Sequence, residues 1–318
     1  MRLVRPKTTG GDKVWAVLLT NETYLPGVLA LAHSLRSVGS AYGLIVLYTD
    51  TLPSKVLSAL SARFIDTQLI DYIRPANGPN YSNDPRFNDC WTKLAAFSLT
   101  QYERVVQLDA DMLVLQNMDE LMTLPLDSAT EASKGSSSTR VLAAGHACVC
   151  NPLHKKHYPA DWVPSNCAFT TQHGTPETAH QIAPAFNASP MGYLNGGLLV
   201  LVPSAALWER ILNYMHANAS GMGFADQSVL SELFAGRWVP LPYIYNALRT
   251  MRWEGVHEVI WRDDKVKNLH YILDPKPWAA QTGEVGMRLE KDPTYQWWVD
   301  LDQQRKTWDK NNGITDGL

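Results

Sequence analysis

Mostly apolar runs alternate with amphipathic segments along the first part of the chain. These runs predict strands at 14–20, 44–48 and 105–108, the last of them buried, and a further strand is expected around 67–72. Between them, apolar residues recur at helical spacing over 24–38 and 54–63, and a further helix is expected over 91–101. Strands and helices that alternate in this way are typical of βαβ units. We therefore predict an α/β fold whose central sheet is mostly parallel and flanked by helices.

The second half of the sequence is less regular. Residues 127–190 are rich in Ser, Thr, Ala, Pro and His, and a loop of this length is uncommon in a compact domain and often functional. The periodic pattern resumes with a strand at 194–202, helices at 204–217 and 226–234, and a strand at 266–269. The sequence has neither an internal repeat nor a clear linker. We expect one domain over 14–318 after a tail of 1–13, with the parts 14–125, the insertion 127–190, 191–290 and a C-terminal helical segment 291–318.

Composition and charge describe a globular chain and give no sign of a nucleic-acid or membrane partner. The 318 residues are 45% hydrophobic and 19% charged, with a formal net charge of −3 and no long basic run. No apolar run approaches the ~18 residues needed to span a bilayer. The start of the chain lacks the apolar core of a secretory signal. We therefore expect a cytoplasmic protein without a membrane span; a fragment of a longer secretory-pathway protein is the alternative.

Two aspartates directly after the strand at 105–108 are the most informative feature of the chain. Asp109 and Asp111 would lie at the carboxyl end of that strand, where open α/β sheets bind ligands. Two carboxylates there suit a hard divalent cation such as Mn²⁺ or Mg²⁺, which leaves coordination positions for phosphate oxygens. The alternative is an aspartate-rich turn after a strand, since Asp favours turns and helix N-caps.

The cysteines are expected to be thiols rather than disulfides. They are Cys90, Cys148, Cys150 and Cys167, and a cytoplasmic chain keeps such residues reduced. The last three, with histidines of the segment 145–157, could hold zinc, but Cys-x-Cys is not the usual Cys-x₂₋₄-Cys knuckle. We favour buried thiols and loop histidines here, and the sequence leaves zinc binding open.

A series of short motifs extends over residues 14–278. In chain order they are Thr20-Asn21 with Tyr24, Trp91-Thr92-Lys93-Leu94, Asp109-Ala110-Asp111, Asn195-Gly196-Gly197, Asp226-Gln227, Tyr245-Asn246, and His270 with Lys276-Pro277-Trp278. Each motif is weak alone. In this order, the series resembles glycosyltransferase family 8, the retaining sugar-nucleotide transferases that include glycogenin and galactinol synthase.

The resemblance implies a single GT-A type nucleotide-sugar-binding domain. It implies an enzyme that moves a hexose, with retention, from a UDP-sugar to a hydroxyl of a small polyol or glycan acceptor. Mn²⁺ would be held by Asp109, Asp111 and His270, and Asp226, Gln227 and Lys276 would be catalytic. The donor would be bound by Thr20, Asn21, Tyr24, Arg86, Lys93, Asp109, Ala110, Asn195, Gly196, Gly197 and Lys276. Residues 14–125 would form the nucleotide-binding half and 191–290 the acceptor and catalytic half.

Several alternatives stay open. The donor sugar could be glucose, galactose or N-acetylglucosamine. Retention of configuration could follow double displacement or a same-face route. The oligomeric state is open, and a homodimer is possible. Asp226 could instead be a helix N-cap. Leu273 replaces a glycine of the family, which puts the loop before Lys276 in question, and Trp238, Trp253 and Trp261 are candidates for an acceptor platform. The competing functions are a non-catalytic sugar-nucleotide or carbohydrate-binding protein and, less favoured, a haloacid-dehalogenase-type phosphohydrolase.

Overall fold

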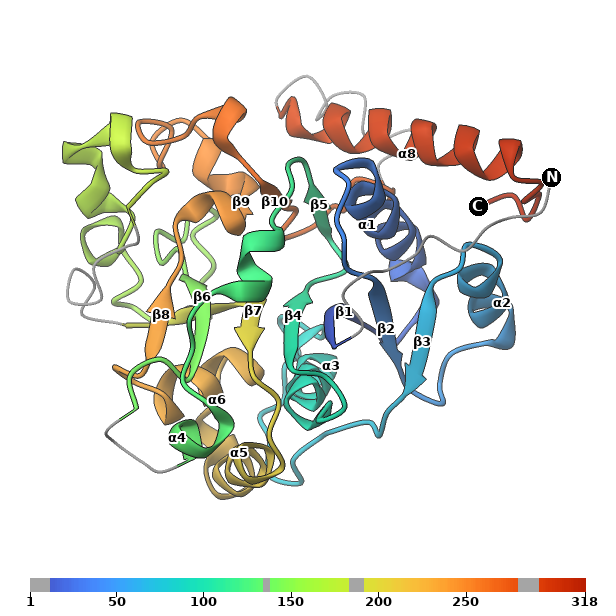
Figure 1. The fold of residues 1–318 in the computed structure, drawn as a ribbon. Helices are drawn as coiled ribbons and strands as arrows, with labels where there is room; N and C mark the ends of the chain where they lie inside the picture. Colours follow the sequence, from blue (N-terminus) through green and yellow to red (C-terminus); the bar gives the residue numbers. More distant parts are fainter. Residues whose placement is uncertain (1–11, 134–137, 183–191, 280–291) are drawn as a thin grey trace.

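A seven-stranded sheet forms the centre of the molecule (Figure 1). The structure is a computed structural model and describes residues 12–133, 138–182, 192–279 and 292–318. The strand order is β3-β2-β1-β4-β7-β6-β8, and β7 runs antiparallel to both of its neighbours while the other pairs are parallel. A second, three-stranded sheet has the order β5-β10-β9. The predicted α/β fold with a mostly parallel central sheet is therefore confirmed.

The strands of the large sheet are β1 (Lys13–Leu19), β2 (Leu44–Tyr48), β3 (Asp66–Leu69), β4 (Arg104–Leu108), β6 (Leu142–His146), β7 (Leu194–Leu201) and β8 (Trp238–Pro240). The small sheet contains β5 (Met112–Val114), β9 (Ala247–Leu248) and β10 (Asn268–His270). The α-helices are α1 (Leu25–Ser37), α2 (Ser54–Ala62), α3 (Phe87–Cys90), α4 (Ala129–Ser133), α5 (Ala205–Asn218), α6 (Asp226–Leu233) and α8 (Thr294–Asn311). The 3₁₀ helices are Glu22–Tyr24, Trp91–Ser98, Asp119–Thr123, Pro164–Asn166, Thr170–Gly174, Pro176–Thr178, Ala219–Gly221, Tyr243–Tyr245, Arg249–Arg252 and Asp263–Lys265.

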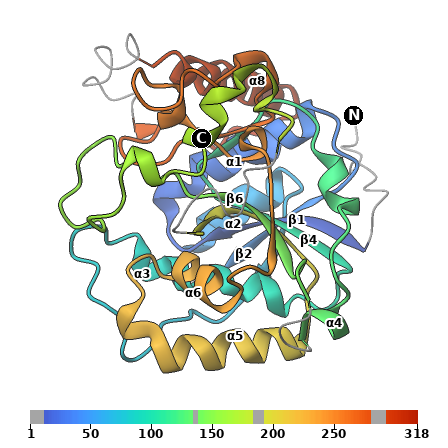
Figure 2. The ribbon, with the colours of Figure 1, turned by 90° about the vertical axis from the view of Figure 1, so that its left-hand side faces the viewer.

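Helices cover both faces of the large sheet, which gives three layers (Figure 2). In β1, Val14 and Ala16 belong to a core shared with α5 and α6, whereas Trp15 and Val17 belong to a core shared with α1 and α2. All four side chains are buried. A strand buried on both faces has a continuous apolar sequence, and this is why the pattern at 14–20 predicted it.

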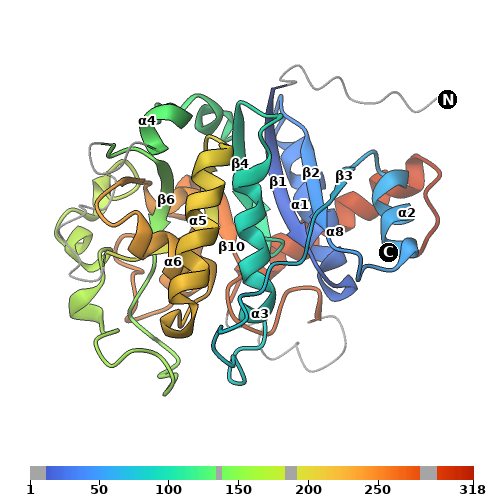
Figure 3. The same cartoon turned by 90° about the horizontal axis from the view of Figure 1, so that it is seen from below.

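The C-terminal helix α8 lies against α1, and Figure 3 shows it on the side of the sheet away from α5. Arg63, directly after α2, fixes this end of the chain. Its buried guanidinium pairs with Asp309 of α8 at 2.8 Å and with Asp316 at 2.6 Å. Among the described residues, no helix combines the length and the apolar character that a membrane span requires.

Several elements differ from the pattern-based expectation: β5, β8, β9, α3 and α4 were not predicted, and β3 ends at Leu69. The helix expected over 91–101 is a 3₁₀ helix that ends at Ser98, and its residues 91–97 are all buried. Strand β6 lies inside the segment 127–190, where no strand was predicted. Its sequence, Leu-Ala-Ala-Gly-His, has neither β-branched residues nor polar alternation, because all five residues are buried between β7 and β8.

Candidate active site

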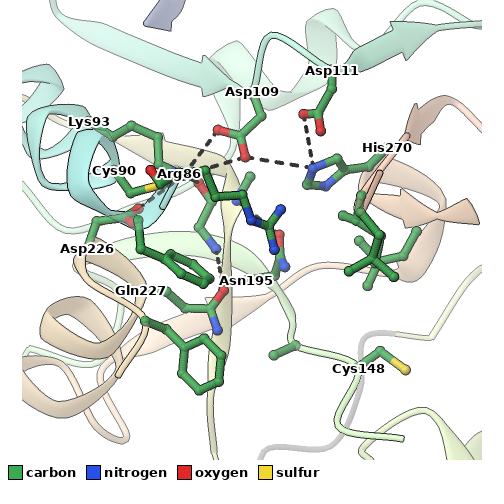
Figure 4. Close-up of a pocket in the computed structure, with 18 of the residues that line it drawn as sticks. Arg86, Cys90, Lys93, Asp109, Asp111, Cys148, Asn195, Asp226, Gln227 and His270 are labelled. Atoms are coloured by element: carbon green, nitrogen blue, oxygen red, sulfur yellow. Dashed lines mark hydrogen bonds and ion pairs between the residues drawn. The ribbon is translucent and has the colours of Figure 1, made fainter. Parts of the chain in front are cut away.

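A pocket opens at the edge of the large sheet where the parallel strands β1 and β4 end (Figure 4). Because β7 runs in the opposite direction, its first residues, 195–197, reach the same edge. The loop after β1, the start of α6 and the end of β10 supply further lining. Open α/β sheets bind their ligands at this edge.

Most of the site residues predicted from the sequence converge on this pocket. The lining includes Thr20, Asn21, Tyr24, Arg86, Lys93, Asp109, Ala110, Asp111, Asn195, Gly196, Gly197, Asp226, Gln227 and His270. Lys276 is the exception, because it is buried behind Asp111 and is not part of the lining. Residues from nearly the whole length of the sequence thus meet at one place.

Asp109, Asp111 and His270 face one another in the pocket (Figure 4). The two aspartates lie in the link between β4 and β5, and β10 pairs with β5 so that His270 is opposite Met112. His270 Nε2 is 3.3 Å from Asp111 Oδ1 and 3.7 Å from Asp109 Oδ2. One ligand atom of each residue lies within 4.8 Å of the others. Two carboxylates and an imidazole of this arrangement can hold a divalent cation.

A chain of hydrogen bonds determines which nitrogen of His270 faces the carboxylates. The Gly197 N–H donates to Asn195 Oδ1 (2.9 Å), and Asn246 Nδ2 donates to the same oxygen (2.8 Å). Asn246 therefore presents its Oδ1 to His270 Nδ1, at 2.9 Å. A neutral His270 must carry its proton on Nδ1, which leaves the Nε2 lone pair directed at the two aspartates. Metal-binding histidines are commonly oriented by a bond of this kind.

We expect Asn246→Leu to weaken binding of a divalent cation roughly 10- to 100-fold, because His270 loses the acceptor that fixes its tautomer and ring orientation. Calorimetric titration with Mn²⁺ measures the effect. Asn246→Asp loses the donor to Asn195 Oδ1 but keeps an oxygen that can accept from His270 Nδ1, so its loss should be smaller. Equal affinity of the wild type and Asn246→Leu would show that this bond does not orient the ligand.

Lys276 lies directly behind Asp111. Its Nζ donates to Asp111 Oδ2 at 2.5 Å and to the Tyr271 carbonyl oxygen at 2.9 Å. Burial by itself would raise the pKa of Asp111, but Lys276 and His270 outweigh burial and hold this pKa well below its usual range. Asp111 is therefore ionised at neutral pH, as a metal ligand has to be.

A second carboxylate, Asp226, lies on the other side of Asp109, and Lys93 bridges the two. Lys93 Nζ is 3.1 Å from Asp109 Oδ1, 3.2 Å from Asp226 Oδ2 and 3.3 Å from the Gly196 carbonyl oxygen. Burial, assisted by the charge of Asp109, raises the pKa of Asp226 to about 6 although Lys93 opposes this shift. At Gly196 a Cβ would lie 2.6 Å from Asp226 Oδ2, so glycine leaves room for the carboxylate.

Asp226 is not the cap of its helix. α6 begins at Asp226, the cap residue is Ala225, and no side chain caps this end. The neighbouring Gln227 uses its Oε1 to accept the Gly196 N–H at 3.3 Å. The start of α6 therefore presents a carboxylate and an amide to the pocket beside 195–197 (Figure 4).

Two of the predicted donor-binding residues have local partners. Thr20 Oγ1 donates to Asp89 Oδ2 at 2.8 Å. Asn21 Oδ1 accepts from the Thr23 N–H at 3.1 Å and caps the short 3₁₀ helix that precedes α1. Both side chains line the pocket and also shape the loop after β1.

Arg86 and Tyr24 are placed to meet a ligand more directly. Figure 4 shows the Arg86 guanidinium extending into the pocket, and its Nε has no hydrogen-bond partner among the described residues. The Tyr24 ring packs edge-to-face on Trp278, with ring centroids 5.6 Å apart. Trp278 in turn lies over Gly27, where a Cβ would come within 2.7 Å of the indole. A small residue in α1 thus lets the loop after β10 close against Tyr24.

The loop that leads to Lys276 keeps a glycine-like backbone without a glycine. Leu273, which lines the pocket, has φ of +66°. This left-handed conformation costs an ordinary residue about 1–2 kcal/mol. Leu273 therefore has a backbone conformation that usually favours glycine.

One wall of the pocket was not predicted residue by residue. It comes from the segment 127–190 and contains Cys148, Asn151, Pro152, Leu153, Lys155, Tyr158 and Trp162. Trp162 stacks on Phe224, with ring centroids 4.5 Å apart. The unusual length of the segment was the one sequence signal for this wall.

The proposed tryptophan platform is wrong for this pocket. Trp238, Trp253 and Trp261 are absent from its lining. Trp238 packs on His146, and Trp253 Nε1 donates to Asp292 at 3.4 Å. Trp261 Nε1 donates to Asp263 at 2.5 Å. The indole that lines the pocket is that of Trp162 instead.

Comparison with known proteins agrees with this arrangement. The family model described as Glycosyl transferase family 8 matches residues 16–282. Galactinol synthase 1 of Ajuga reptans is 26% identical over 300 residues, which cover 91% of this chain and 81% of that protein. Glycogenin of Neurospora crassa is 26% identical over 304 residues, which cover 93% of this chain and 36% of that protein.

The fold is also that of solved glycosyltransferases. The crystal structure of the galactosyltransferase LgtC in complex with donor and acceptor sugar analogs superposes with a TM-score of 0.56 at 16% identity, covering 92% of this chain and 96% of that chain. The apo form of the glycosyltransferase GlyE of Streptococcus pneumoniae gives a TM-score of 0.55 at 17% identity, covering 93% and 64%. The GT-A type fold expected from the sequence is confirmed. Since the family match extends over most of its length, the chain belongs to glycosyl transferase family 8.

Proposed function

We propose that the protein is a Mn²⁺-dependent retaining glycosyltransferase that moves a hexose from a UDP-sugar to a hydroxyl of a small polyol or glycan acceptor. The observation that carries the proposal is that one pocket contains both a set of potential metal ligands and a separate carboxylate. Asp109, Asp111 and His270 could hold a cation, and Asp226 lies on the other side of Lys93 from them. This arrangement suits cleavage of a bond between a sugar and a diphosphate.

The cation site would take the diphosphate end of the donor. A bound Mn²⁺ would neutralise the diphosphate leaving group as a Lewis acid, and Asp109, Asp111 and His270 Nε2 are suitable ligands. Lys276, buried behind Asp111, would add positive charge near the leaving group without lining the pocket itself. The Arg86 guanidinium extends into the same pocket and can donate to phosphate oxygens.

The sugar of the donor would lie between 195–197 and the start of α6. Asn195 would bind sugar hydroxyls, and the backbone of Gly196 and Gly197 would border the sugar, because the missing side chains let Asp226 and His270 pack against these two residues. Asp226 would face the anomeric carbon, either as a nucleophile or as a negative charge that stabilises an ion pair during same-face substitution. Tyr24 would stack on the uracil at the other end of the donor.

The acceptor would enter along the wall formed by Tyr158, Trp162 and Phe224. Aromatic faces suit the apolar surfaces of sugars and cyclic polyols, and the amide of Asn151 and the ammonium of Lys155 can bind hydroxyls. This division of tasks keeps 14–125 as the nucleotide-binding half and assigns acceptor binding to 191–290 together with the insertion.

The pH dependence of kcat should show a single-proton fall at acidic pH. The pKa of Asp226 is raised to about 6, and the proposed reaction uses the ionised carboxylate, so activity is lost as the pH falls through this value. A cation bound at Asp109 would lower this pKa, whereas the negative charge of the donor and the further burial of Asp226 under it would raise it. We would measure kcat from acidic to neutral pH at saturating UDP-sugar. The residual rate of Asp226→Asn should lack this limb, and an unchanged limb would contradict the assignment.

The proposal as a whole is tested by calorimetric titration with UDP, with and without Mn²⁺, followed by hydrolysis assays with a panel of UDP-sugars. Metal-dependent binding of UDP and slow hydrolysis of one UDP-sugar would support the proposal and identify the donor. Binding without hydrolysis or transfer of any donor would favour a non-catalytic sugar-nucleotide-binding protein. Absence of UDP binding under both conditions would overturn the site.

A further inference from the structure

A second cluster of potential metal ligands lies at the base of the unpredicted pocket wall. It consists of Cys148, Cys150, Cys167 and His257, whose ligand atoms all lie within 4.8 Å of one another. His257 Nε2 is 3.2 Å from Cys150 Sγ and 3.3 Å from Cys167 Sγ. All three cysteines are free thiols, so no disulfide joins them. The cluster shares no residue with the carboxylate site.

The geometry matches a tetrahedral zinc site with four protein ligands. In such a site, Zn–S distances of about 2.3 Å and Zn–N distances of about 2.0 Å place neighbouring ligand atoms roughly 3.5–3.8 Å apart. The two measured sulfur–nitrogen distances are slightly shorter than this, and a small expansion around the ion would bring them into range. Three cysteines and one histidine are a common donor set of structural zinc sites.

The surroundings of His257 also suit a metal ligand. The imidazole is fully buried, and Cys150 and Cys167 are buried as well. Its Nδ1 is 2.9 Å from His173 Nε2, so a proton on Nδ1 can be donated to His173. The Nε2 lone pair then faces both sulfurs. One lone pair cannot accept from two thiols at once with good geometry, whereas a single cation can bind all of these atoms.

We propose that Cys148, Cys150, Cys167 and His257 bind a structural Zn²⁺ ion that fixes the segment 147–173 to the segment that follows β9. This reverses the expectation of unligated thiols. The three histidines of 145–157 that the sequence suggested are not in the cluster; the histidine comes from 90 positions beyond Cys167. Cys-x-Cys is sufficient because Cys167 and His257 approach from other loops.

The proposed ion also explains how the pocket wall is held. The described residues of 147–182 contain no strand or α-helix, and their regular structure is limited to the 3₁₀ helices Pro164–Asn166, Thr170–Gly174 and Pro176–Thr178. Tyr158 and Trp162, which line the pocket, lie between the second and third cysteines. The backbone hydrogen bonds of this segment are almost all local turns, so a metal cross-link to His257 would fix its position relative to the rest of the fold.

Metal analysis of the wild-type protein, purified without chelators from zinc-supplemented medium, tests the proposal first. We expect about one zinc per chain. Replacement by Co²⁺ should give a thiolate-to-cobalt charge-transfer band and the strong visible bands of tetrahedral cobalt. Asp111→Asn should keep the zinc, which separates this site from the carboxylate site. Absence of both zinc and the cobalt spectrum, or a disulfide between two of the three cysteines in the unreduced protein, would overturn the proposal.

Variants locate the ion. Cys150→Ser should lose most of the zinc, whereas Cys90→Ser, which alters the cysteine outside the cluster, should retain it. Limited proteolysis should then cut Cys150→Ser within 147–173 faster than the wild type. His173→Ala keeps all four ligands and removes the acceptor of His257 Nδ1, so it is the milder test and should weaken zinc binding roughly 10- to 100-fold. Full zinc retention in Cys150→Ser would contradict the ligand set.

Discussion

Asp111→Asn should abolish the Mn²⁺ dependence of UDP binding and lower kcat/KM for the UDP-sugar about 10³-fold, which corresponds to ~4 kcal/mol. Asp111 is buried, ionised and directed at both His270 Nε2 and Lys276 Nζ, at 3.3 Å and 2.5 Å. Asparagine has nearly the same shape and keeps an oxygen for Lys276, but it lacks the charge that a hard cation requires. The loss should therefore concern metal binding and not the fold.

Calorimetric titration of the variant with UDP, with and without Mn²⁺, is the direct measurement. Asp300→Asn on α8 is the matched control, because Asp300 is exposed and does not line the pocket. It should bind UDP as the wild type does. If Asp111→Asn keeps a metal-dependent affinity for UDP, the cation lies elsewhere. Thermal unfolding of both variants excludes a folding defect as the cause of a loss.

Strands β1 and β2 could be predicted because they are buried on both faces. The runs at 14–20 and 44–48 correspond to β1 and β2, since a strand covered on both sides needs apolar residues at every position. The same reasoning fails for β6. Its Ala and Gly residues are small because helices and neighbouring strands enclose them, and no local pattern expresses this.

In the candidate site, too, some residues could be placed from the local sequence and others depend on contacts between distant parts of the chain. Asp109 and Asp111 could be placed at a strand end from the sequence alone, and His270 was assigned through the family resemblance. The contacts of Asn246 with His270 and of His257 with Cys167 could not be predicted from the sequence pattern, because the partners are distant in the sequence. Both contacts involve residues in or next to the small sheet, and the position of this sheet depends on the complete fold.

Lys93→Met should lower kcat at neutral pH about 100-fold or more, and it should move the acidic limb of the pH profile to higher pH. Lys93 was predicted to reach the donor, but its Nζ lies between Asp109, Asp226 and the Gly196 carbonyl oxygen. Without this cation, the buried Asp226 carboxylate and the partly exposed Asp109 carboxylate remain near each other. The pKa of Asp226, already raised to about 6 with Lys93 present, must rise further.

The direction of each change distinguishes this role from direct binding of the donor. A lysine that holds Asp226 in its ionised form affects kcat and the pH midpoint, and kcat should partly recover at alkaline pH. A lysine that binds the diphosphate would instead raise KM for the UDP-sugar at every pH. The apparent affinity for Mn²⁺ should not fall, because Asp109 loses a competing cation. Lys265→Met, at an exposed position, is the control and should keep the wild-type profile. An unshifted acidic limb in Lys93→Met would show that Asp226 is not the group that titrates.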